Sequence, residues 1–326
     1  MKHAKILTGT VKESQCGQRL DYTLAKMFPD YSRSQIKTWI LAGLVWVNEL
    51  VKVIPKTKML GGECIKIQAL IDEEPCWEAQ AIPLNIVYED EALLIINKPR
   101  NQVVHPGAGN TDGTMLNALL YYIPSIIAVP RAGIVHRLDK DTTGLIVVAK
   151  NVTAQTRLIE SLQAHEITRK YEAIVIGTMT ANGTVEQPIA RHTIKRKQMV
   201  THSLGKPAVT HYRIMEQFRA HTRLILCLET GRTHQIRVHM AHLNHPIVGD
   251  PLYGKRPRLS KYASKALNDV LCRFDRQALH STFLRLYHPI TSIPMEWYAP
   301  MPQDMVTLIA ALKEDTKQLK ESRYCL

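Results

Sequence analysis

Apolar residues in the first 70 positions recur at helical spacing in two neighbouring segments and then at strand spacing. The helical positions are Leu20, Leu24, Met27 and Phe28, followed by Ile36, Trp39 and Ile40. The strand-like stretches are residues 44–48, 51–54 and 63–67. The pattern predicts a compact module of two helices and a hairpin over about residues 18–68, after a loose lead-in at residues 1–15.

Residues 71–85 are acidic and contain proline, which is typical of a linker. Further along the chain, strand-like runs are frequent and helical spacing is rarer. The predicted strands are IVYED, LLIINK, LIVVAK, YEAIVIG and HTRLILCLET, and the predicted helices cover 114–122, 153–165, 233–243 and 302–320. Because strands and helices do not alternate regularly, we expect an α+β fold with a mixed, mostly antiparallel central sheet. The predicted domains are 1–70 and 86–326.

The run HTRLILCLET has the clearest alternation of the predicted strands. Its three leucines, at 224, 226 and 228, fall on one face of a period-2 strand. Ile225 and Cys227 fall on the other face, so we expect the middle of this strand to be covered on both sides.

The sequence holds 42 Lys and Arg against 29 Asp and Glu, a net charge of +13. This excess suits a polyanionic partner, because Lys and Arg release counterions from phosphates. Basic residues gather in two acid-free, loop-like stretches, 187–215 and 251–268. Solvated surface loops would explain either stretch alone, but together with the basic module they favour nucleic acid. The predicted contact residues are Arg33 and Lys37 in the module, Arg191, Lys195, Arg196 and Lys197 in the first stretch, and Lys255 and Arg256 in the second.

Cysteine spacing and hydropathy argue against several protein classes. The six cysteines include no Cys-x-x-Cys pair, which indicates reduced thiols in a cytoplasmic protein and no zinc knuckle. The N-terminal residues lack the apolar run of a signal peptide, and no stretch reaches the roughly 18 apolar residues of a membrane span. P-loop and dinucleotide fingerprints are also missing. We therefore expect a protein that needs no cofactor, metal or membrane.

The segment GIVHRLDKDTTGLIVVAK, residues 133–150, places charged residues in a polar turn before a buried strand. Cations near Asp139 and Asp141 favour ionised carboxylates, and an anionic Asp suits a nucleophile better than a general acid. The alternative is a structural turn in which both carboxylates accept hydrogen bonds from backbone amides, and turn chemistry alone favours it.

The segment 229–254 combines Arg232 and Arg237 with a predicted helix that Thr233 can cap. Arg232 and the helix N-terminus offer an anion site. Histidines at 234, 239, 242 and 245 raise the alternative of a metal site, but no thiolate or carboxylate stands among them. A third segment, ITRKYEAIVIG, carries Tyr171 at a strand start, where a tyrosine either closes the core edge or stacks on an extruded base.

These segments, HRLDKDTTGL, RKYEAIVIG and GRTHQIRVHMAHLNHPIVGDPLYG, resemble the signature motifs of the RluA-type pseudouridine synthases. Asn97-Lys98-Pro99 and the run HPGAGNTDGTMLNALL resemble an early motif of the family, and the 19–66 module resembles an S4 RNA-binding domain. The resemblance covers nearly the whole chain. One departure is Thr143, where many relatives have Ser.

The resemblance implies a role for each matching residue. Asp139 would be the catalytic carboxylate and Arg237 its partner. Tyr171 would stack on the target base and help remove the C5 proton. Ile236, Arg137 and His136 would bind the substrate: Ile236 would form an apolar wall, and Arg137 would fill the gap left by the extruded nucleotide.

The substrate implied by the resemblance is large-subunit (23S) ribosomal RNA, free or in a subunit precursor. A cluster of uridines in the subunit-interface stem-loop (helix 69) would be isomerised by a monomeric enzyme. Two alternatives remain open: a non-catalytic RNA-binding assembly factor, and a base-excising glycosidase that uses Asp139 and Asp141 as a carboxylate pair.

Overall fold

The computed structural model describes residues 2–324 except Asp30, Ser32, 73–76, Ala108 and 255–262. The chain divides into two compact units, Met1–Trp77 and Glu78–Leu326, each of which is described by itself. No helix within the described ranges has the length and apolar character that crossing a membrane requires.

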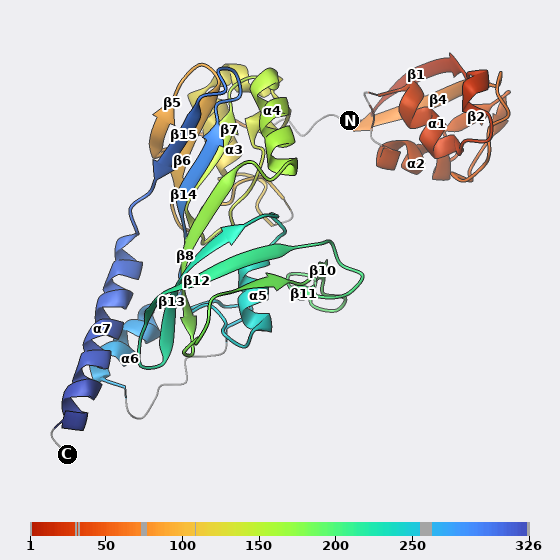
Figure 1. Cartoon of the computed structure of the whole chain (residues 1–326). Coiled ribbons are helices and arrows are strands. Elements are labelled where there is room, and N and C mark those ends of the chain that lie inside the picture. Colours follow the sequence, from red (N-terminus) through yellow and green to blue (C-terminus); the bar gives the residue numbers. More distant parts are fainter. Residues whose placement is uncertain are drawn as a thin grey trace. The chain divides into compact units, whose positions relative to one another are not determined.

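The small unit packs two helices against a four-stranded sheet of order β1-β4-β2-β3 (Figure 1). All six elements and a short 3-10 helix fall within residues 2–72. Their bounds are β1 Lys2–Thr10, η1 Glu13–Gln15, α1 Leu20–Met27, α2 Arg33–Leu41, β2 Val45–Val47, β3 Leu50–Val51 and β4 Cys64–Asp72. The predicted apolar faces of the two helices form its core, in which Leu20, Leu24, Ile36 and Ile40 are fully buried.

The predicted loose lead-in was wrong, because β1 pairs along its whole length with β4. Local sequence could not reveal β1, whose partner lies more than fifty residues away, at Cys64–Asp72. The predicted linker is also shorter than residues 71–85: β4 includes Asp72, and the Gln80 amide donates to Asn117 O at 3.0 Å in the large unit.

The large unit contains one nine-stranded sheet, of order β5-β6-β7-β14-β8-β13-β12-β9, with β15 paired to β14. Neighbouring strands are antiparallel except β7 and β14, which confirms the predicted mixed, mostly antiparallel sheet. The bounds are β5 Ile86–Glu89, β6 Leu93–Lys98, β7 Thr143–Ala149, β8 Thr168–Ile176, β9 Gly183–Glu186, β12 Val209–Gln217, β13 His221–Leu228, β14 Leu279–Tyr287 and β15 Pro294–Tyr298.

Helices and a small hairpin surround this sheet, with α4 against β7 and α5 against β12 (Figure 1). The bounds are η2 Pro124–Ala128, η3 Pro130–Gly133, α3 Met115–Tyr122, α4 Val152–Gln163, α5 Gln235–His242, α6 Lys265–Arg273 and α7 Gln303–Tyr324, and the hairpin strands are β10 Ile189–Arg191 and β11 Met199–Thr201. Helix α6 was missed, because it lies in a stretch that its basic charge and prolines made loop-like. Strand β13 buries its leucine face, whereas Ile225 and Cys227 are half-buried, so the second face is covered only in part.

Strand β7 is buried at all seven positions and sets the place of the loop before it. Gly144 has φ +109°, and a Cβ atom there would lie 2.2 Å from the carbonyl oxygen of Ser281. Only glycine allows this approach, by which β7 pairs in parallel with the start of β14. The polar loop 138–142 is thereby held beside the ends of the central strands.

Candidate active site

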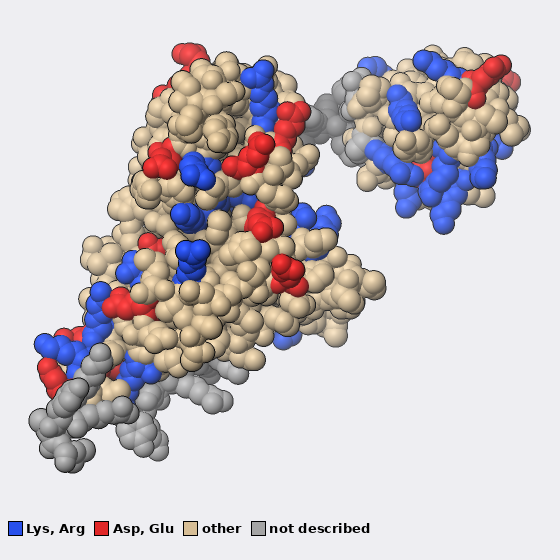
Figure 2. All heavy atoms as spheres, in the orientation of Figure 1, with Lys and Arg blue, Asp and Glu red and all other residues tan. Residues whose placement is uncertain are grey.

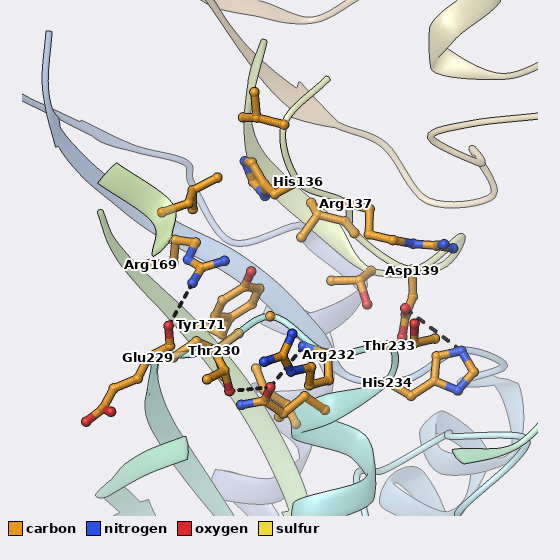
Figure 3. A pocket seen from close by; sticks show the side chains of 18 of the residues that line it. His136, Arg137, Asp139, Arg169, Tyr171, Glu229, Thr230, Arg232, Thr233 and His234 are labelled. Carbon is orange, nitrogen blue, oxygen red and sulfur yellow. Dashed lines mark hydrogen bonds and ion pairs between the residues drawn. The ribbon is translucent and has the colours of Figure 1, made fainter. Parts of the chain in front are cut away.

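A pocket of about 650 Å³ opens in the large unit where β7, β8, β13 and β14 meet their loops. Its lining comes from the loop before β7, from α4 and the turn after it, and from the connection between β13 and α5 (Figure 3). Five arginines line it against two acidic residues, Asp139 and Glu229. The arginines are Arg131, Arg137, Arg169, Arg232 and Arg237. The pocket therefore suits an anionic ligand.

Asp139 lies in this pocket and binds Arg237. The Nη1 atom of Arg237 donates to Asp139 Oδ2 at 2.9 Å, and the carboxylate remains 15% exposed. Nε2 of His234 lies 3.9 Å from the other carboxylate oxygen, but burial lowers the pKa of His234, so this imidazole is neutral at pH 7. The carboxylate thus has one permanent cationic partner and stays open to the pocket.

Arg237 is itself held by a second carboxylate that the sequence analysis missed. Its Nε and Nη2 donate to Asp250 at 2.7 and 2.8 Å, and the Asp250 side chain is fully buried. Burial opposes the charge of Arg237, but its bonds to both carboxylates outweigh burial and raise its pKa. The Tyr253 ring lies 5.1 Å from the guanidinium, and its hydroxyl bonds His234 Nδ1 at 2.8 Å. The run GDPLYG was the available signal for both residues.

The loop that carries Asp139 is anchored through its backbone. Two buried cations donate to consecutive carbonyl groups, and a buried amide donates to the next side chain. These contacts join Lys98 Nζ to Lys140 O (3.0 Å), Arg276 Nη1 to Asp141 O (3.2 Å) and Gln277 Nε2 to Thr142 Oγ1 (3.0 Å). Burial lowers the pKa of Lys98 to about 7, although the nearby aspartates oppose that shift. Asp139 therefore projects from a rigid support.

Asp141 behaves as the structural alternative predicted. Its Oδ1 accepts a hydrogen bond from the Asn101 backbone amide at 3.2 Å, and it is not among the residues lining the pocket. Asp139 and Asp141 therefore do not form a carboxylate pair facing one cavity.

Tyr171 and Ile236 form buried walls of the pocket, 4% exposed each. Burial raises the pKa of Tyr171, so its phenol is protonated at neutral pH. Thr143, at the start of β7, is not among the residues lining the pocket, and its Oγ1 bonds His280 Nδ1 at 2.8 Å.

His136 and Arg137 differ in exposure although they are adjacent. Nε2 of His136 accepts a hydrogen bond from the Val147 amide at 3.1 Å, and burial lowers the pKa of this imidazole to about 3. His136 therefore joins the loop to β7 as a neutral group. Arg137 is exposed at the pocket edge, where it is free to meet a ligand.

The residues predicted to contact RNA fall in several places. Lys195, Arg196 and Lys197 are exposed in the turn between β10 and β11, beside Arg191 on β10. Arg232 lines the pocket, and its Nε donates to Pro207 O at 3.0 Å. Arg33 and Lys37 are exposed on α2, in a unit whose Lys and Arg gather on one face (Figure 2). Lys255 and Arg256 lie outside the described residues.

The histidines of α5 and its flanks bind separate protein groups. His239 bonds Thr210 Oγ1 and Gln187 O, and His245 bonds Ile176 O. No group of His, Cys, Asp or Glu within the described ranges is arranged to hold a metal ion. The helix also begins later than predicted: its N-cap is His234, at φ 57°, rather than Thr233.

Two family models match the chain: RNA pseudouridylate synthase over residues 92–242, and the S4 domain over residues 18–63. The chain belongs to the RNA pseudouridine synthase family, with an N-terminal S4 domain, and is an enzyme of that class.

Curated relatives match over almost their whole length. The chain is 67% identical over 315 residues to ribosomal large subunit pseudouridine synthase D of Escherichia coli strain K12, covering 97% of both chains. The proteins of the same name from Yersinia pestis and Haemophilus influenzae are 66% and 61% identical, covering 97% and 95% of both chains.

Solved structures of human proteins share the fold. RNA pseudouridylate synthase domain containing 4 is 25% identical with a TM-score of 0.54, covering 70% of this chain and 93% of its own. RNA pseudouridylate synthase domain containing 1 is 26% identical with a TM-score of 0.54, covering 75% and 96%.

Proposed function

We propose that this protein isomerises uridines to pseudouridine in large-subunit (23S) ribosomal RNA, with Asp139 as its catalytic carboxylate and without a cofactor. The observation that carries the proposal is the Asp139–Arg237 pair in an arginine-lined pocket. Relatives at 67% identity that are named for the large ribosomal subunit support the choice of RNA. Within this RNA, the proposed target is a cluster of uridines in the subunit-interface stem-loop (helix 69).

The reaction breaks the N1–C1′ bond of uridine and rejoins the uracil through C5. It is redox-neutral and adds no water, so a single carboxylate suffices, whereas most glycosidases use two. Arg237 holds the Asp139 carboxylate oriented, either for attack on C1′ or for proton removal at C2′. In both courses the low-dielectric walls strengthen the interaction between carboxylate and sugar.

The remaining pocket residues bind and position the nucleotide. Tyr171 stacks on the base, and Ile236 closes the apolar side of the pocket. Because the Tyr171 phenol is protonated at neutral pH, it assists removal of the C5 proton as a hydrogen-bonding group rather than as a phenolate. Arg137, exposed at the pocket edge, fills the gap left by the extruded uridine.

Sequence-independent affinity comes from basic residues outside the pocket. The exposed turn at 195–197 and the basic face of the small unit supply phosphate contacts, so RNA binding should weaken steeply with salt. The cytoplasmic location and the monomeric state stay predictions.

Site mapping in cells tests this function directly. Large-subunit RNA from cells lacking the protein would be complemented with wild type or Asp139→Asn, and pseudouridines mapped by carbodiimide-dependent reverse-transcription stops. We expect wild type to restore the missing positions and Asp139→Asn to reduce the rate by roughly 10⁴-fold or more.

The other outcomes separate the alternatives. Restoration by both proteins would show that Asp139 is not catalytic. No missing position would favour an assembly factor, and release of free uracil would indicate a glycosidase.

A further inference from the structure

Arg169 is a buried cation without an anionic partner in the described part of the chain. It lies on β8 at the edge of the pocket and is 6% exposed. Its Nη2 donates one hydrogen bond, to Glu229 O at 3.3 Å, and its Nε is buried with no partner among the described residues. A charged group taken out of water is costly unless it is paired and its donors are satisfied.

The other deeply buried cations in the described part of the chain are satisfied. They are Lys98, Arg237 and Arg276. Lys98 donates to three carbonyl oxygens, and each of the two arginines binds a carboxylate through at least two donors. Arg169 alone among these four cations keeps several N–H groups for a ligand.

The acidic residue to which Arg169 donates does not neutralise it. Glu229 accepts only through its backbone oxygen, while its carboxylate binds His211 Nε2 at 2.6 Å. In Figure 3 the Glu229 side chain extends away from the Arg169 guanidinium. A Cβ atom at Gly231 would lie 3.0 Å from Arg169 Nη1, so the absence of a side chain there leaves room for the guanidinium.

We propose that Arg169 binds a backbone phosphate of the RNA, one of the two that flank the uridine in the pocket. This rests on the proposed function, because it takes the ligand to be an extruded nucleotide. A phosphodiester supplies the missing negative charge, and its oxygens can accept hydrogen bonds from two N–H groups of one guanidinium at once. A base carbonyl would accept one hydrogen bond and leave the charge uncompensated.

The position of Arg169 fits such a contact. In Figure 3 the Tyr171 ring lies between Arg169 and Asp139. In the proposed complex the base lies on Tyr171, the sugar lies at Asp139 and a flanking phosphate lies against Arg169. The phosphate would then fix the sugar relative to the carboxylate.

A cycle that combines a protein change with a phosphate change tests this assignment. Arg169→Gln and wild type would be compared on a target stem-loop whose flanking phosphates are replaced, one at a time, by neutral methylphosphonates. Both RNA affinity and pseudouridine formation would be measured. The matched control is Arg285→Gln, which removes the charge of an exposed arginine that is not part of the pocket lining.

We expect a methylphosphonate at one flanking position to weaken wild-type binding roughly 10- to 100-fold, and Arg169→Gln to weaken binding of normal RNA by a similar factor. Combining the two should cost little more than either alone. The control variant should respond to the methylphosphonate as wild type does. Arg169→Gln should melt at the same temperature as wild type or higher, since it removes an uncompensated buried charge.

Losses that add in full at both positions would overturn the assignment, as would wild-type binding that tolerates both neutral linkages. A lowered melting temperature with unchanged RNA affinity would likewise show a structural role. If the cycle holds for binding but wild type forms no pseudouridine, the proposed function fails while the phosphate site stands.

Discussion

Two arginines in one pocket have opposite surroundings. At the Asp139 side, Arg237 is bound by two carboxylates and all its contacts are made within the protein. At the other side, Arg169 donates one long hydrogen bond to a carbonyl oxygen. Both are buried to a similar degree, 4% and 6% exposed.

The difference indicates what each cation does. A cation saturated by carboxylates cannot gain much from a ligand, so Arg237 serves to orient Asp139. A cation that keeps free donors gains from an anion, so Arg169 serves to hold one. Burial raises the strength of both interactions, because the local dielectric is low.

The largest effect on activity should come from removing a carboxylate that binds Arg237. Asp250→Asn removes one of the two negatively charged groups that bind Arg237. The guanidinium would then turn from its position against Asp139. We expect kcat to fall by roughly 10²-fold while RNA affinity stays within about twofold. Stability should also fall by about 3–5 kcal/mol, since Asp250 is fully buried.

Single-turnover kinetics and filter binding on the folded variant would measure the two parts, with circular dichroism confirming the fold. An Asp250→Asn enzyme with wild-type kcat would show that Asp139 needs no such orientation.

An effect of intermediate size is expected on the pH dependence of stability, through the neutral imidazole of His136. Burial, helped by the charge of Arg169, lowers the pKa of His136 from 6.5 to about 3. Between these values the unfolded chain binds a proton that the folded chain does not, so the free energy of unfolding falls as the pH drops from 6.5 towards 3. This single group contributes up to about 1.4 kcal/mol per pH unit.

His136→Gln isolates this contribution, because its amide oxygen can accept from the Val147 amide but does not titrate. Urea unfolding at pH 7, 6 and 5 should show that the free energy of unfolding falls less steeply with pH in the variant than in wild type. Arg169→Gln should lie between them, because it removes one cause of the lowered pKa. If the free energy of unfolding fell equally with pH in all three proteins, His136 would not be a neutral group in the folded protein.

The smallest effect should be a loss of RNA affinity caused by a substitution that crowds Arg169. Gly231→Ala would press a methyl group against Arg169 Nη1, 3.0 Å away, and shift the guanidinium by a few tenths of an ångström. RNA affinity should drop roughly twofold to fivefold. In a background of Arg169→Gln, the same change should have no effect on RNA affinity. A loss of affinity as large as in wild type would show that Gly231→Ala does not act through Arg169.

The local parts of this fold were predictable from the sequence. The apolar faces of α1 and α2 and the leucine face of β13 follow from residue spacing, because the helix turn and the strand pleat each repeat within a few residues. Strand β1 was missed because its stability comes from β4, which lies far along the chain. Strand β12, with one fully buried residue among nine, gave too weak an alternation to predict.

The site was predictable in its chemistry but not in its geometry. The HRLD, KYEA and HQIR segments led to Asp139, Tyr171 and Arg237 through a family resemblance, and the structure brings these residues to one pocket. Residue patterns left Asp139 and Asp141 equivalent, and their separation appears only in the fold. Asp250 stood in view within GDPLYG, but nothing local connects it to Arg237.

By itself, then, the sequence determined the polarity of each segment, the excess of positive charge and the motifs that name the family. The tertiary structure alone decided which charges are paired. Asp139 and Arg237 are 98 positions apart, and Arg169 and Glu229 are 60 apart. Contacts of that range depend on how β7, β8 and α5 close around one cavity, and it is this closure that leaves Arg237 saturated and Arg169 open.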